Sequence, residues 1–179
     1  MARCIAPGLG RRFAFEKLKQ FNAQHWRALC EASRAQQQLG TLLRIYGSDV
    51  NGNVLSAARA NLEAAGLADA VTLKQVSMLD AKPPAEAGII VMNPPYGIRT
   101  GEQDDLAGFY PLLGDALKQR FAGWRAHIFT ADLRLPKLIR LTPSRRTPLF
   151  NGALECRLYE FRLIQGSMRR MAPKQPGDV

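Results

Sequence analysis

Short apolar runs alternate with helical patterns along most of the chain, and this alternation restricts the fold more than any other feature. The runs expected to form strands are residues 41–46, 70–76, 88–92 and 125–130. Helices are expected over residues 53–65, 105–121 and 133–139, and a further helix, N-capped by Asn22, is expected to run toward Gln38. Strands that alternate with helices usually pair in parallel, because each helix carries the chain back across the sheet. The sequence therefore predicts an α/β fold with a mostly parallel, doubly wound sheet and helices on both faces.

The last third of the chain breaks this alternation. Residues 146–150 and 154–164 are both strand-like and flank Asn151-Gly152, which predicts an antiparallel hairpin with a type I′ turn at one edge of the sheet. Residues 165–179 are polar and contain two prolines, and we expect them to form a disordered tail. One domain over residues 1–164 is therefore expected.

Length and charge narrow the class of protein. The chain has 179 residues, of which 46% are hydrophobic, enough for one domain with a packed core. Its net charge of +10 favours a polyanionic partner such as nucleic acid. Cys4, Cys30 and Cys156 are widely spaced and odd in number, so no metal site is indicated. No signal peptide follows Met1 and no apolar stretch approaches the length of a membrane span, so we expect a cytoplasmic protein without membrane contact.

Residues 93–97 read Asn-Pro-Pro-Tyr-Gly and directly follow the apolar run 88–92. Two consecutive prolines stiffen the loop and donate no backbone hydrogen bonds. The Asn93 side-chain oxygen and the carbonyls of Asn93 and Pro94 are therefore acceptors that can take the N–H protons of a planar amine. Such acceptors localise the lone pair of the nitrogen in the transition state. Tyr96 offers a face for a stacked base. The loop thus predicts methyl transfer to an exocyclic nitrogen, although Asn-Pro-Pro can also form an ordinary turn.

Asp49 follows the run 41–46 and precedes a helix, so it is expected at the carboxyl end of a strand. A carboxylate in that position can accept hydrogen bonds from the ribose hydroxyls of an adenosyl cofactor. It can also cap the helix that follows. The Asn-Pro-Pro-Tyr stretch at the end of a later strand favours ribose binding.

Four segments, taken together, resemble one family. They are Ile5-Ala6-Pro7-Gly8-Leu9; Gly47-Ser48-Asp49 with Ala58-Arg59-Ala60-Asn61 and Ala65-Gly66; Asn93 to Arg99; and Asn151-Gly152-Ala153-Leu154-Glu155-Cys156. Over about residues 2–164 the chain resembles the catalytic domain of bacterial large-subunit (23S) ribosomal RNA guanine-N2 methyltransferases. These are THUMP-associated, UPF0020-type enzymes.

The resemblance implies a Rossmann-like methyltransferase sheet and methyl transfer from S-adenosylmethionine to the N2 amine of a guanine in ribosomal RNA. It implies a catalytic loop formed by Asn93, Pro94, Pro95 and Tyr96. The expected substrate contacts are Tyr96, Gly97 and Arg99. The expected cofactor contacts are Asp49, Val50, Ser77, Met78 and Asn93.

Two departures from the family pattern accompany the resemblance. Ser77 stands where an Asp usually meets the adenine amine, with Asp80 close by. The first strand and the glycine-rich turn are missing, as is the THUMP region, so we expect an N-terminally truncated domain whose isolated chain binds S-adenosylmethionine weakly or not at all. Gly8-Leu9-Gly10 does not replace that turn, because it follows Pro7 rather than a strand.

Alternatives to the guanine reaction remain open at this point. They are N6-adenine methylation of DNA, N5-glutamine methylation of protein, which the basic charge disfavours, and a non-catalytic basic RNA-binding remnant. Four further basic residues are either a solvated face or a phosphate track: Lys137, Arg140, Arg145 and Arg146.

Overall fold

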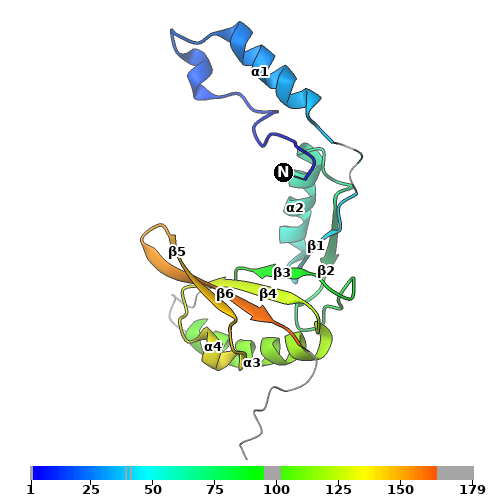
Figure 1. Cartoon of the computed structure of the whole chain (residues 1–179), viewed down its shortest axis with the longest axis vertical. Helices are drawn as coiled ribbons and strands as arrows, with labels where there is room; N and C mark the ends of the chain where they lie inside the picture. The colour runs from blue at the N-terminus through cyan, green and yellow to red at the C-terminus, as the bar shows by residue number, and fades with distance from the viewer. Residues whose placement is uncertain (1, 39, 41, 95–101, 165–179) are drawn as a thin grey trace, which may run out of the picture. The chain divides into compact units, whose positions relative to one another are not determined.

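The computed structural model describes residues 2–38, 40, 42–94 and 102–164, with side chains described from residue 107 onward within the helix that begins at Glu102. The chain divides into two compact units, Met1–Val76 and Ser77–Val179, and each is described by itself. Figure 1 labels their helices and strands. No described helix is long and apolar enough to cross a membrane.

The first unit contains a β-α-β arrangement. Strand β1 (Ile45–Asp49) pairs in parallel with β2 (Val71–Gln75), and α2 (Gly52–Ala64) connects them. The Asn51 side chain accepts the N–H of Asn53 at 2.9 Å and so caps the first turn of α2. The helix ends before Gly66, whose φ of +66° suits a glycine after a helix.

The N-terminal part of the first unit is helical. The 3₁₀ turn η1 (Ala14–Lys17) leads to α1 (Ala23–Ala35). Asn22 accepts the N–H of His25 at 2.9 Å, which confirms the predicted N-cap, and the helix ends at Ala35 rather than near Gln38.

The second unit is a four-stranded sheet with strand order β3-β4-β6-β5. Strand β3 (Ile89–Met92) is parallel to β4 (Arg125–Thr130), and β6 (Leu154–Arg162) runs antiparallel to both β4 and β5 (Arg145–Asn151). Helices α3 (Glu102–Arg120) and α4 (Leu135–Leu138) lie on the same side of this sheet (Figure 1).

The core of the second unit forms between this sheet and the two helices. It includes the apolar face of α3 and the inward side chains of β4 and β6. The largest buried members are Tyr110, Leu113, Leu117, Ile128, Leu135, Ile139 and Phe161. The mixed α/β fold with an antiparallel hairpin at the sheet edge is as predicted.

Three local predictions are wrong. The buried strand expected over residues 41–46 is not found in its described part, residues 42–46: β1 begins at Ile45, where pairing with β2 starts, and Ile45 and Tyr46 are about half exposed. The run 88–92 is expected to be a buried strand, but in β3 Ile89 and Val91 are 65% and 75% exposed, because α3 and α4 cover only the other face of the second unit's sheet.

The hairpin turn is the third correction. Asn151 pairs with Leu154, so the two loop residues are Gly152 and Ala153. Gly152 has a φ of +61°, and Ala153 is not among the described residues with positive φ. A positive φ at the first loop position alone is typical of type II′, not type I′.

Candidate functional site

Asp49 is the last residue of β1 and is half-buried. Its backbone oxygen accepts the N–H of Val76 at 3.1 Å, which ties the ends of β1 and β2 together. Its side-chain Oδ1 accepts the N–H of Asn51 at 2.8 Å. Since Asn51 caps α2, Asp49 itself is not the N-cap, and the helix-cap alternative is wrong. Among the described residues, no hydrogen bond reaches Oδ2 of Asp49.

Val50 follows at the same strand end and is exposed. Its backbone oxygen accepts a hydrogen bond from Nε2 of Gln75, the last residue of β2, at 3.0 Å. A Cβ at Gly52 would come within 3.2 Å of Oε1 of the same Gln75 side chain. The side chains of Asp49 and Gln75 therefore both hydrogen-bond to the backbone of the loop that starts at Asp49.

Ser77 and Met78 stand at the start of the second unit. The Ser77 hydroxyl oxygen accepts the N–H of Leu79 at 3.1 Å, and its backbone oxygen accepts from Asp80 and Ala81 at 2.9 Å each. Ser77 is half-buried in this turn, and Met78 packs against the apolar core of the second unit. The hydroxyl hydrogen of Ser77 can still be donated.

Asn93 and Pro94 directly follow β3, with Asn93 exposed and Pro94 half-buried. The residues that carry the predicted acceptors, Asn93 and Pro94, therefore lie at the end of a strand, as the sequence predicts. Pro95, Tyr96, Gly97 and Arg99 lie outside the described residues.

A second polar group, which the sequence reasoning missed, lies at the same end of the sheet. β3 and β4 are parallel with Met92 opposite Ile128, so the residues after β4 follow on beside those after β3. Thr130 and Asp132 are buried there. The Thr130 hydroxyl accepts the N–H of Asp132 at 3.0 Å, which shapes the turn out of the strand.

Asp132 is held by Arg134 through two side-chain hydrogen bonds of 2.9 Å each, and it also accepts the Arg134 backbone N–H at 2.9 Å. These hydrogen bonds hold the pKa of Asp132 below its usual value, against the opposing effect of burial. Nearby, burial raises the pKa of Tyr110, and a side-chain interaction with Thr130 opposes this effect. The signal available in the sequence was Thr-Ala-Asp-Leu-Arg immediately after an apolar strand.

The structure thus gathers part of the predicted site. Asn93 and Pro94 share one end of the second unit's sheet with Thr130 and Asp132. Asp49 and Val50 stand at the corresponding carboxyl end of β1 in the first unit. Among the residues described, no group of three or more His, Cys, Asp and Glu side chains could hold a metal ion.

Residues 1–160 match the family model described as UPF0020: RMKL-like, methyltransferase domain. The chain belongs to this family. Over all of its residues it is also 36% identical to Ribosomal RNA large subunit methyltransferase K/L of Shewanella baltica (strain OS185). That alignment covers 26% of the relative, so the chain spans about a quarter of the length of the curated relatives it matches.

Solved structures agree with the fold of this UPF0020 domain. SMU.472, named as a methyltransferase and solved in complex with SAH, superposes with a TM-score of 0.82 at 28% identity over 92% of this chain and 44% of that one. A predicted N6-adenine-specific DNA methylase from Listeria monocytogenes gives a TM-score of 0.79 at 24% identity, over 90% of this chain and 41% of that one, and shows the fold alone. The predicted Rossmann-like methyltransferase fold is confirmed.

Proposed function

We propose that this domain transfers a methyl group from S-adenosylmethionine to the exocyclic N2 amine of a guanine in ribosomal RNA. The observation that carries the proposal is the position of Asn93 and Pro94 at the carboxyl end of β3, where ligands of open α/β sheets bind. The family match, the name of the Shewanella relatives and the SAH complex of SMU.472 support it.

Asn93 and Pro94 would hold the amine. The Asn93 side-chain oxygen and the Pro94 carbonyl accept its two N–H protons, and the nitrogen lone pair then points at the methyl donor. Pro94 has no N–H that could compete for these acceptors. In this proposal Tyr96 stacks against the base, Gly97 leaves room for the nucleotide to come close to the backbone, and Arg99 contacts a phosphate. The target guanine must be unstacked and unpaired, because a paired N2 amine is occupied.

The proposed cofactor contacts follow β1, β2 and β3 along the chain: Asp49 and Val50, Ser77 and Met78, and Asn93. Oδ1 of Asp49 is engaged by Asn51, which fixes the carboxylate, and Oδ2 is left to accept from ribose hydroxyls. The proposal places Val50 and Met78 beside the adenosyl group and assigns the adenine edge to Ser77. When bound, S-adenosylmethionine supplies an electrophilic methyl group on a sulfonium sulfur. The residues of this chain contribute position and orientation, which account for a large share of the rate in such transfers.

The substrate is tested by nucleoside mass spectrometry. The protein is incubated with methyl-deuterated S-adenosylmethionine and, in separate reactions, unmodified 23S ribosomal RNA, single-stranded DNA and total ribosomal protein. We expect deuterium in N2-methylguanosine from RNA. Label confined to N6-methyladenine in DNA or to glutamine in protein would replace the proposed substrate. RNA binding with no label in any polymer would favour the non-catalytic alternative.

A matched pair of variants tests the residue assignment in the same assay. Asn93→Ala should lower labelling by at least about 100-fold, because the amine loses an acceptor that acts in the transition state. Asn61→Ala changes an exposed side chain of α2 and should leave labelling unchanged.

A further inference from the structure

The N-terminal part of the first unit is a small packed assembly of its own. Phe15 meets Trp26 edge-on with ring centroids 5.0 Å apart, and Phe13 meets Trp26 edge-on at 5.8 Å. Phe13 and Phe15 are stacked at 5.3 Å, and Phe21 lies 6.0 Å from Phe15. These aromatic contacts hold the loop before η1 against α1. The loop and the helix therefore present their side chains in a defined arrangement.

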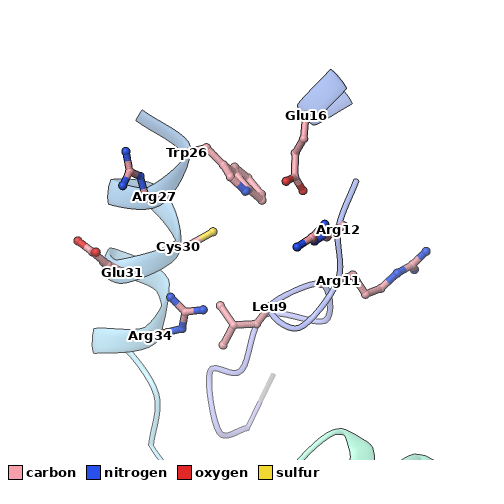
Figure 2. Close-up of a pocket in the computed structure, with 10 residues that line it drawn as sticks. Leu9, Arg11, Arg12, Glu16, Trp26, Arg27, Cys30, Glu31 and Arg34 are labelled. Atoms are coloured by element: carbon pink, nitrogen blue, oxygen red, sulfur yellow. The ribbon is translucent and has the colours of Figure 1, made fainter. Parts of the chain in front are cut away.

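A cavity of about 320 Å³ opens between this loop and α1. Its walls include Leu9, Trp26 and Cys30 (Figure 2). In the close-up, Arg12 extends from the loop toward α1, and Arg34 lies on the helix beside Leu9. The volume is at the small end of ligand pockets, which are about 300–1,000 Å³.

The charge of the cavity is positive. Four arginines line it, against Glu16 and Glu31. Oε1 of Glu16 accepts the backbone N–H of Phe13 at 2.7 Å, and Glu31 points away from the cavity in the close-up. Within the described part of the chain, neither Arg12 nor Arg34 has a carboxylate within 4.0 Å. Two guanidinium groups therefore face one small space, and the Glu16 carboxylate that lies near Arg12 and Trp26 in the close-up only partly offsets the positive charge of the four lining arginines.

We infer that this cavity, defined by Arg12, Trp26 and Arg34, binds a backbone phosphate of the RNA substrate, with the adjoining nucleotide against Trp26. A guanidinium presents planar N–H donors that match phosphate oxygens, and indole offers a face for a base. The inference rests on the proposed function for the identity of the polymer. It adds an RNA contact outside the Asn93 loop and outside the cofactor residues.

Equilibrium binding of a fluorescein-labelled single-stranded RNA tests the inference with a readout that does not need methyl transfer. The variant Arg12→Gln/Arg34→Gln should raise Kd by about 5-fold or more, because a charge-assisted phosphate contact is lost. It should also reduce the slope of log K against log salt by roughly 0.7, the share of one phosphate on a single strand. The matched control Arg44→Gln/Arg59→Gln removes the same charge from exposed positions of the same unit and should change Kd by less than about 2-fold.

Tryptophan fluorescence provides the second measurement. Trp26 and Trp124 are the two tryptophans, and Trp124 is buried in the core of the second unit. RNA should therefore change the emission of the unaltered protein, and this change should disappear in Trp26→Phe while circular dichroism stays the same. Inorganic phosphate is the comparison probe and should need a far higher concentration for the same effect.

Three results would overturn the inference. They are equal losses of affinity in the two double variants, an RNA-induced emission change that persists in Trp26→Phe, and an equal response to inorganic phosphate. Because binding is measured directly, loss of RNA affinity in Arg12→Gln/Arg34→Gln supports the cavity even if no methyl transfer is found. Conversely, methyl transfer to guanine with unchanged binding in that variant would refute the cavity alone.

Discussion

The sheet of the second unit rests on a closed apolar core, whereas the two-stranded sheet of the first unit has little buried side chain beneath it. Tyr110, Leu113 and Phe161 are fully buried in the second unit. Among the described residues of the first unit, the buried apolar side chains are those of Leu55 and Ala70. The proposed amine-binding residues therefore follow a strand with a well-packed core beneath it. The proposed ribose-binding residue Asp49 ends a strand with few buried side chains beneath it.

Polar contacts add to the small set of buried apolar side chains in the first unit. Arg3 is buried and makes two hydrogen bonds to Asp69, at 2.9 and 2.7 Å. Asn51 and Asp49 fix the loop after β1. Such contacts define local geometry, but each contributes less free energy than a buried aromatic ring.

Phe161→Ala should destabilise the protein by about 3–5 kcal/mol, because it leaves a cavity in the core of the second unit. Phe150→Ala is the matched control: it lies in the same hairpin with 70% of its surface exposed, and should cost less than about 0.5 kcal/mol. Urea unfolding followed by near-UV circular dichroism measures both. Equal costs would show that the core does not support the second unit as described.

Gly114→Ala should destabilise by about 1–3 kcal/mol, because its Cβ would collide with the backbone oxygen of Ile139 where α3 meets the end of α4. Gly108→Ala, in the same helix with open space around the added carbon, should instead be neutral or stabilise by up to about 1 kcal/mol. Thermal unfolding of both variants checks the pair. The same sign for both would contradict the packing of α3 against α4.

Asp132→Asn should cost about 1.5 kcal/mol at neutral pH, since it weakens charge-assisted hydrogen bonds with Arg134. The pKa of Asp132 is lower in the folded protein than its unfolded value of about 3.9. Its contribution is therefore complete above the unfolded value and is lost as pH falls through the folded one. The stability difference between wild type and variant, measured by urea unfolding, should shrink across that acid range. A difference independent of pH would refute the role of the carboxylate.

Arg3→Gln should have the smallest effect and should be confined to the first unit. Its hydrogen bonds to Asp69 raise the pKa of Arg3 and lower that of Asp69, so both groups stay charged at neutral pH. Hydrogen exchange should become faster over residues 67–76 and stay unchanged over β4. Asp69→Asn removes the same ion pair and should reproduce the pattern. Equal acceleration in both units would remove the distinction between them.

Local patterns predicted most elements, because their signals lie within a few residues. The predicted cap Asn22 is the N-cap of α1, which begins directly after it, and the helix expected over residues 105–121 is found as α3. The errors have non-local causes. The start of β1 depends on pairing with β2, and the exposure of Ile89 and Val91 depends on which helices cover the sheet.

In the candidate site, too, the residues with a local sequence signal were predicted and those that depend on tertiary packing were missed. Asp49 and Asn93 were predicted at strand ends because each directly follows a strand-like run. Asp132 and Tyr110 were missed, because burial of a carboxylate and a hydroxyl becomes visible only when α3, α4 and β4 are packed together. The Arg12 and Arg34 pair was missed for a similar reason, as 21 intervening residues separate them and the aromatic cluster brings them to one cavity.

The most direct test of the central claim is steady-state kinetics of the Asn93→Ala variant on unmodified 23S ribosomal RNA. If Asn93 holds the guanine amine in the transition state, kcat should fall by at least about 100-fold while the KM for RNA changes by less than about 3-fold. An unchanged kcat, or a loss confined to KM, would contradict the assignment of Asn93 as the residue that activates the amine.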